Sequence, residues 1–253
     1  MTIKHLETAT GRRLAYAKTE GAGPTVVFLG GLRSDMEGTK ALHLEAWAQA
    51  QGQAFLRFDY SGHGVSSGAF VEGSVAEWAE DAVDMLEAAT NGPVVLVGSS
   101  MGGWVSLVAS KALGARVVGL VTIAAAPDFT EDEWWAGFSE EQRTTLLRDG
   151  RLELPSDYDD GPYVVTQKLI EDSRRVLVFS NPLPLPMPVR FLHGTGDEVV
   201  STELALRLLN YATGSDMRLT LVDAADHRFS TPDCLDLITS TVEEVLERAR
   251  AVA

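Results

Sequence analysis

Cysteine is almost absent from this sequence, since its 253 residues contain only Cys234. A single thiol excludes an internal disulfide and is typical of proteins kept in a reducing compartment. Basic residues are also scarce, with 21 Lys and Arg against 36 Asp and Glu, which gives a formal net charge of −15. Diffuse negative charge repels phosphate groups, so we expect no nucleic-acid partner.

Long apolar runs are missing as well. No stretch holds 18 uncharged apolar residues, so we expect no membrane span. The first 21 residues lack the apolar core of a secretory signal, and together these absences predict a soluble, cytoplasmic protein. Zinc-ligand spacings, a G-x-x-x-x-G-K-[ST] phosphate loop and a G-x-G-x-x-G dinucleotide loop are absent too, so we expect no metal and no cofactor.

What the chain does contain is an alternation of short apolar runs with segments of helical spacing. Runs rich in Val, Leu, Ile and Phe, separated by amphipathic segments, are typical of a mainly parallel sheet covered by helices on both faces. The chain is long enough for one large domain, and its predicted class is α/β. The expected strands lie near residues 25–30, 54–59, 93–98, 117–124, 188–194 and 218–224.

Several residues mark where helices begin and end. Ser74 with Glu77 forms a capping box before an apolar stripe. Thr231 followed by Pro232 is typical of a helix start, and Gly52 is placed to end an earlier helix.

Residues 127–187 interrupt the alternation. They are rich in aromatic residues and end in the proline-rich NPLPLPMP. We expect a short, mostly helical insertion, which is either a lid over a pocket or a helical excursion anchored by its aromatic side chains. The core domain is then expected at 1–126 and 188–253. Two further capping boxes are expected in the insertion, Thr130 with Glu133 and Ser139 with Gln142.

Two adjacent serines, Ser99 and Ser100, lie between an apolar run and a cluster of glycines. A strand that turns sharply into a helix can expose one side chain, provided that the residues two positions before and after it are small. Measured from Ser100, those positions are Gly98 and Gly102; measured from Ser99, they hold larger side chains. The G-x-S-x-G spacing therefore predicts Ser100 as the nucleophile.

A nucleophile of this kind needs donors for the oxyanion that forms on its substrate. The backbone N–H of Met101, at the start of the helix after Ser100, is the expected first donor. The expected second donor is the N–H of Leu32, since Gly30 and Gly31 before it allow close approach of the backbone, although an ordinary turn would use glycines too.

The base is sought among only five histidines. His227 lies in a loop after the last strand and before the last helix, from which an imidazole can reach the top of the sheet, so it is the predicted base. The other four are expected to be exposed or structural: His5, His43, His63 and His193.

The acid must orient the imidazole through its other ring nitrogen. Asp197 leaves the preceding strand at the same sheet edge and is the predicted acid. Asp128 leaves another strand at that edge and competes with it, while Glu198 ranks third. Asp226 adjoins His227 in sequence, but adjacent side chains diverge.

Four motifs in this order, GSSMGGW, DYSGHGVS, HGTGDEVV and DHR, resemble parts of the α/β-hydrolase superfamily: the first corresponds to the nucleophile elbow, the third to the acid loop and the fourth to the base loop. The stretch EGTKALHLEAWAQAQGQAFLRFDYSGHGVSSG is similar to the group that contains the mitochondrial α/β-hydrolase domain protein ten and its bacterial relatives. The resemblance implies an α/β-hydrolase fold and a serine esterase or thioesterase of a group associated with protein depalmitoylation and acyl-glucuronide cleavage. It implies Ser100, Asp197 and His227 as the catalytic residues.

The resulting hypothesis is a serine hydrolase that cleaves small-molecule acyl esters or thioesters, or acylated protein, through an acyl-enzyme. A ligand-binding protein on the same scaffold, or the same residues acting on amide or carbon–carbon bonds, remain alternatives. Substrate contacts are expected near Gly31 and Arg33, the latter facing an anionic group or simply exposed. Three tryptophans either line an apolar site or anchor the fold: Trp104, Trp134 and Trp135.

Overall fold

The structure, a computed structural model, describes residues 2–154 and 162–252. Its centre is an eight-stranded sheet with the strand order β1-β2-β4-β3-β5-β6-β9-β10. β2 pairs antiparallel with β1 and β4, and the remaining neighbours are parallel, as predicted. The strands are β1 (Lys4–Glu7), β2 (Arg13–Thr19), β3 (Ala22–Leu29), β4 (Gln53–Phe58), β5 (Val94–Ser99), β6 (Val117–Ile123), β9 (Val189–Gly194) and β10 (Met217–Val222).

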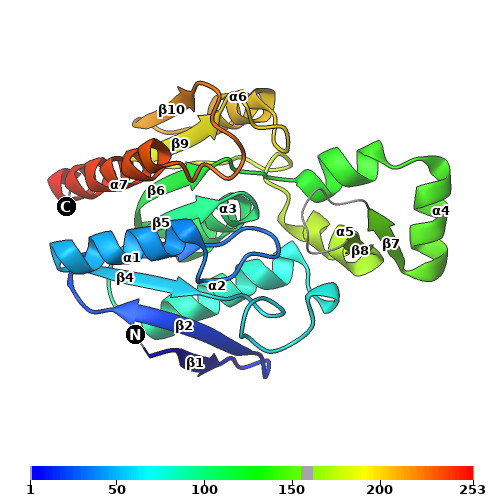
Figure 1. Cartoon of the computed structure of the whole chain (residues 1–253), viewed down its shortest axis with the longest axis horizontal. Coiled ribbons are helices and arrows are strands. Elements are labelled where there is room, and N and C mark those ends of the chain that lie inside the picture. The colour runs from blue at the N-terminus through cyan, green and yellow to red at the C-terminus, as the bar shows by residue number, and fades with distance from the viewer. Residues whose placement is uncertain (1, 155–161, 253) are drawn as a thin grey trace.

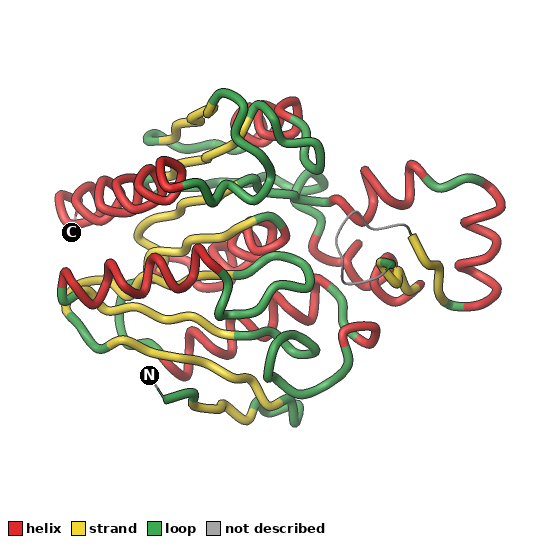
Figure 2. Tube along the Cα trace, in the orientation of Figure 1, coloured by secondary structure: helices red, strands yellow, loops and turns green. Residues whose placement is uncertain are grey.

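Helices cover both faces of this sheet (Figures 1 and 2). Successive side chains of a strand point to opposite faces, so Val26 and Phe28 pack into one core while Val27 and Leu29 pack into the other. This explains why the strands read as continuous apolar runs. One face carries α1 (Thr39–Gln51) and α7 (Pro232–Val252), and the other carries α2 (Val75–Ala89), α3 (Met101–Leu113) and α6 (Thr202–Tyr211).

Most of the predicted helix ends match the structure. Gly52 follows α1 in the left-handed region, at φ 63°, the Ser74 side chain accepts the N–H of Glu77, and α7 begins at Pro232. Ser139 and Gln142 form both hydrogen bonds of a capping box. Thr130 is not a cap, because it is the first residue of a π-helical turn whose N-terminal neighbour is already helical.

The segment between β6 and β9 stands beside the sheet, at the right of Figure 1. Where a mostly helical insertion was predicted, β7 and β8 also form an antiparallel pair. Residues 155–161, between these strands, lie outside the described residues. The elements of this segment are the π-helical turn Thr130–Trp135, α4 (Glu140–Asp149), β7 (Arg151–Leu154), β8 (Tyr163–Thr166), α5 (Gln167–Ser173) and a 3-10 turn at Arg174–Val176.

Outside that segment, the described residues also form two short 3-10 turns. Phe70–Glu72 precedes α2, and Gly114–Arg116 joins α3 to β6. Of the helices in the described part of the chain, none combines the length and the apolar character needed to cross a lipid bilayer.

Candidate active site

Ser100 lies at the sharp turn between β5 and α3. Its backbone has φ 55° and ψ −120°, a conformation that residues with a side chain rarely adopt. Small neighbours make the turn sterically feasible: a Cβ added to Gly98 would lie 2.3 Å from the Gly102 carbonyl oxygen, and one added to Gly102 would lie 2.1 Å from the Leu29 carbonyl oxygen. Only residues without a side chain fit two positions before and after Ser100, which gives the G-x-S-x-G spacing a direct steric basis.

The structure brings Ser100, His227 and Asp197 into one row. The Oγ of Ser100 is 3.1 Å from Nε2 of His227, and Nδ1 of His227 is 2.8 Å from Oδ2 of Asp197. The other carboxylate oxygen of Asp197 accepts the backbone N–H groups of Val199 and Val200. With a proton on Nδ1 donated to Asp197, the imidazole presents a free lone pair to the serine hydroxyl.

The surroundings of Asp197 favour its ionised form. Burial alone would raise the pKa of this carboxyl, but hydrogen bonds from His227, Val200 and Val199 outweigh burial and hold the pKa below its usual range. His193, whose Nε2 donates to the Val200 carbonyl, lies 3.9 Å from the same carboxylate. Burial lowers the pKa of His193 despite the attraction of Asp197 and so favours the neutral form of this second imidazole.

The competing acids have other partners. Both oxygens of the buried Asp128 accept backbone N–H groups, from Val178 at 2.7 Å and Phe179 at 2.9 Å, so this side chain ties the end of the insertion to β6. Asp226 accepts the N–H of Phe229 and thereby caps its own loop. Among the three, only Asp197 is hydrogen-bonded to the imidazole of His227.

The loop between β3 and α1, residues 30–38, begins with two glycines and is called the glycine loop; it lies directly against Ser100. A Cβ added to Gly31 would be 3.3 Å from the Ser100 Cβ and 3.4 Å from the Ser99 carbonyl oxygen. Leu32 follows in this loop, and Met101 opens α3 on the other side of the serine. The backbone segments expected to supply the two donors are therefore neighbours of the serine.

Sequence reasoning missed a side chain that supports the base loop, residues 223–231 between β10 and α7. Nζ of Lys40, on the first turn of α1, donates to the carbonyl of Arg228 at 2.5 Å. Ala224 and Phe229 of this loop have positive φ, a backbone conformation that is unfavourable for residues with a side chain. No sequence signal links Lys40 to a carbonyl 188 residues away, because the contact exists only once α1 and the base loop lie side by side.

His63, one of the histidines set aside, is buried among aromatic rings. It lies 4.9 Å from Trp78 and 5.3 Å from Phe70, ring centroid to centroid, and its Nδ1 donates to the Ser61 carbonyl. Burial lowers its pKa from 6.5 to about 4, although the hydrogen bond to Ser61 opposes the shift.

This pKa shift predicts acid sensitivity of the fold. Because the folded state binds the proton more weakly than the unfolded state, the stabilisation is complete above pH 6.5 and is lost as pH falls toward 4. His63→Phe keeps the ring packing and removes the titration. Between pH 7.5 and 4.5, wild type should lose about 2 to 3 kcal/mol more free energy of unfolding than the variant, measured by urea denaturation. His5→Phe, at an exposed position of β1, should track wild type; identical losses in wild type and His63→Phe would contradict the prediction.

The three predicted substrate-contacting tryptophans have different surroundings. Trp104 is fully buried and its indole N–H donates to the Val176 carbonyl, which are the contacts of a residue that anchors the fold. Trp134 is half-buried and packs on Phe129. Trp135 packs within the insertion, where Arg143 and Arg174 lie over its ring.

Arg33 lies at the boundary between the glycine loop and the insertion. Its guanidinium donates to the Pro162 carbonyl and lies 5.4 Å from the centroid of the Tyr163 ring. It lines a cavity of about 290 Å³ whose other described walls are Gly62, His63, Gly64, Phe70, Val71, Pro162 and Val164.

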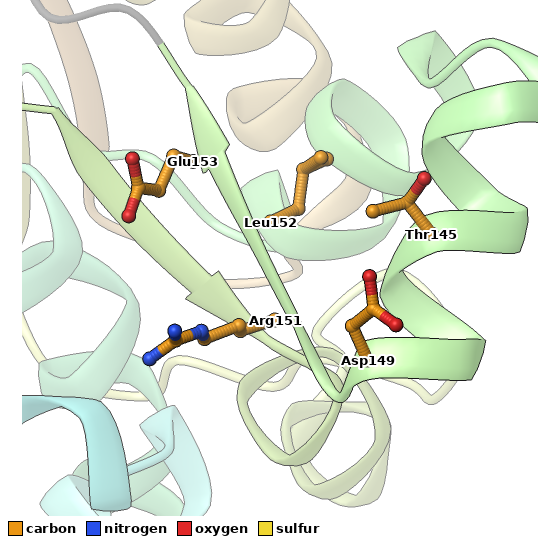
Figure 3. Close-up of a pocket in the computed structure, with 5 residues that line it drawn as sticks. All are labelled: Thr145, Asp149, Arg151, Leu152 and Glu153. Carbon is orange, nitrogen blue, oxygen red and sulfur yellow. The ribbon is translucent and has the colours of Figure 1, made fainter.

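A second cavity, of about 610 Å³, lies within the insertion (Figure 3). Its described walls are Thr145 and Asp149 of α4 and three residues of β7, Arg151, Leu152 and Glu153, so it contains none of the predicted site residues. Across residues 2–154 and 162–252, no three His, Cys, Asp or Glu side chains are grouped to hold a metal ion.

Comparison with known proteins adds close relatives along nearly the whole chain. Palmitoyl-protein thioesterase ABHD10, mitochondrial, of Rattus norvegicus is 32% identical, over 99% of this chain and 84% of that protein. The Mus musculus protein of the same name is 33% identical, over 94% of this chain and 80% of its own length. Both relatives are named as mitochondrial, so the predicted cytoplasmic location is wrong.

Solved structures with the same fold include close relatives. A putative hydrolase from Agrobacterium vitis S4 superposes with a TM-score of 0.92 at 36% identity, covering 97% of this chain and all of that one. Alpha/beta hydrolase domain-containing protein 10 from mouse superposes with a TM-score of 0.91 at 31% identity, covering 98% and 99%.

The family resemblance inferred from the motifs is thus confirmed. The alpha/beta hydrolase family pattern matches residues 26–245, a range that leaves out β1, β2, the start of β3 and the end of α7. Hydrolase activity is shared by the named relatives. By its sequence and its fold, the chain is a hydrolase and belongs to the alpha/beta hydrolase family.

Proposed function

We propose that this protein is a serine hydrolase that cleaves acyl esters or thioesters with Ser100 as nucleophile, His227 as base and Asp197 as the acid that orients the base. The observation that carries the proposal is the continuous hydrogen-bonded row from Asp197 through His227 to Ser100. Each neighbouring pair is within hydrogen-bonding distance, the geometry that proton transfer from a serine requires.

In this mechanism His227 removes the hydroxyl proton of Ser100 as the oxygen attacks the substrate carbonyl carbon. The N–H groups of Met101 and Leu32 stabilise the resulting oxyanion. His227 then donates the proton to the departing alcohol or thiol, which leaves an acyl group on Ser100. Water, deprotonated by His227, attacks this ester, and collapse of the second oxyanion releases the carboxylic acid and returns the proton to Ser100.

The substrate class rests on the relatives and on the residues at the boundary between the glycine loop and the insertion. Relatives named palmitoyl-protein thioesterases support an acyl thioester, on a small molecule or on a protein. Arg33 of the glycine loop lies over the Tyr163 ring, and Trp134 lies against the same tyrosine, so both would contact the acyl or leaving group. As part of this proposal, residues 127–187 form a cap on a core made of 1–126 and 188–253.

A fluorophosphonate probe tests the nucleophile, because it phosphonylates an activated serine and is retained. Wild type should be labelled, with the adduct on the peptide that contains Ser100. Ser99→Ala should still be labelled, whereas Ser100→Ala should not. Equal labelling of wild type and Ser100→Ala, or no labelling of wild type, would refute the assignment.

The bond that is cleaved is tested with matched substrates. An oxygen ester and a thioester with the same acyl chain differ only in the leaving group, so the ratio of their kcat/KM values separates a carboxylesterase from a thioesterase. Turnover of either supports an acyl hydrolase. Turnover of the matching amide alone, or of none of the three, would contradict the proposal.

A further inference from the structure

The glycine loop, residues 30–38, contains Leu32 and is hydrogen-bonded by side chains from the end of β4. We infer that Asp59, Arg57 and Tyr60 are positioning residues that set the place of the Leu32 N–H beside Ser100. The inference rests on the proposed function, since it assumes that this N–H stabilises an oxyanion. Neither the family membership nor the hydrogen-bonded row of the site assigns a role to these three side chains.

Asp59 holds the loop through a backbone N–H. Its Oδ1 accepts the N–H of Met36 at 2.6 Å, and its Oδ2 accepts the N–H of Val65 at 2.9 Å. The Asp59 side chain is buried against the loop after β4, where a Cβ added to Gly64 would be 2.1 Å from Oδ2. One carboxylate therefore joins the glycine loop to the loop after β4.

Arg57 binds the backbone carbonyl of Met36, the residue whose N–H Asp59 accepts. Its Nη1 donates to the Met36 carbonyl at 2.9 Å, and its Nη2 donates to Oε2 of Glu45 at 3.0 Å. Because Glu45 lies on α1, the arginine also connects the loop to the helix that follows it. Both backbone polar groups of Met36 are thus occupied by side chains of one strand end.

The third contact lies at the other end of the loop. The hydroxyl of the fully buried Tyr60 donates to the Gly30 carbonyl at 3.4 Å. Gly30 and Met36 enclose Leu32 in sequence, so the loop is held on both sides of the proposed donor. Between Gly30 and Met36, the Ser34 N–H donates to the Gly31 carbonyl and closes a short turn that further restricts the loop.

Stability alone is a poor explanation for this arrangement. Burying an ion pair costs desolvation that its attraction often fails to repay, and both Arg57 and Glu45 are less than 10% exposed. In the described part of the chain, Nε of Arg57 and Oε1 of Glu45 are buried without a hydrogen-bond partner. Buried polar atoms without a partner call for an explanation, and the need to hold an oxyanion donor in a fixed position provides one.

The expected effect falls on turnover. A displaced donor loses contact with the charge that develops in the transition state and hardly touches the bound substrate, so kcat falls while KM changes little. Removing a whole donor costs about 10² to 10³ in kcat, and displacing it should cost less. We expect Asp59→Asn to lower kcat by about 10-fold to 100-fold and Tyr60→Phe by about threefold, each with KM within about twofold of wild type.

A transition-state analogue separates positioning from a loss of folded protein. An alkylboronic acid that forms a tetrahedral adduct on the serine should bind more weakly in each variant by the same factor by which kcat/KM falls. Concentrations are corrected for active sites titrated with the fluorophosphonate. Glu244→Gln is the control, because Glu244 accepts hydrogen bonds from the buried Arg190 at the other end of the sheet; it should lower Tm and leave kcat and boronate affinity unchanged.

Unchanged kcat and boronate affinity in Asp59→Asn and Tyr60→Phe, with a lower Tm, would overturn the inference and leave these residues a structural role. If Asp59→Asn does not fold, the milder Tyr60→Phe decides by the same two measurements. The proposed function fails by a different result, labelling or turnover that survives in Ser100→Ala, so the two failures are distinguishable.

Discussion

His227→Ala is expected to lower kcat by about 10⁵-fold, since a serine hydroxyl without its base is a weak nucleophile and the departing group loses its proton donor. KM should change little, because the imidazole contributes to the transition state far more than to substrate binding. The measurement is steady-state hydrolysis of a chromogenic acyl ester, with protein folding checked by circular dichroism.

Two further experiments sharpen this prediction. The His227 side chain is 16% exposed, so the space it leaves is open to solvent, and added imidazole should restore part of the activity of His227→Ala. His43→Gln is the matched control, because His43 bonds Thr239 between α1 and α7 and lies outside the row. Activity of His227→Ala within about tenfold of wild type would exclude the imidazole as the base.

Asp197→Asn is expected to lower kcat by about 10⁴-fold, the order found when the orienting aspartate of a serine protease is changed in the same way. An amide in place of the carboxylate can donate to Nδ1, which favours the tautomer with its proton on Nε2, and that nitrogen then cannot accept the serine proton. The amide also cannot stabilise the imidazolium. The pre-steady-state burst with a chromogenic ester should disappear along with turnover.

The matched control is the rival acid. Asp128→Asn removes a carboxylate that accepts the N–H groups of Val178 and Phe179, so we expect a lower stability, by about 1 to 3 kcal/mol, with kcat largely retained. The reverse pattern, turnover lost in Asp128→Asn and kept in Asp197→Asn, would make Asp128 the acid and require rearrangement of the site.

Local patterns were sufficient for the main elements of the fold. All six predicted strands are present. Five of them are largely buried and therefore read as apolar runs, while β10, at the edge of the sheet, is partly exposed. The choice of Ser100 over Ser99 was equally local, since it depends on the size of residues two positions away. The β7–β8 pair was missed because strands of four residues are too short to show a clear period.

Asp128 and Asp197 both follow parallel strands at the same edge of the sheet. Topology alone therefore places either carboxylate where it could orient the base. The structure separates them by neighbours: the end of the insertion occupies Asp128, while His227 reaches Asp197. The same holds for Trp104, whose indole N–H donates to the carbonyl of Val176, 72 residues further along the chain.

The sequence by itself determined the α/β class, the strand-turn-helix around Ser100 and the family, because these depend on side-chain periodicity and on residue size over a few neighbouring positions. Only the tertiary structure decided which carboxylate meets the imidazole, that Lys40 supports the base loop, and that Asp59 and Arg57 enclose Met36. These contacts join segments between 21 and 188 residues apart, and their distances follow from how helices and loops pack around the sheet.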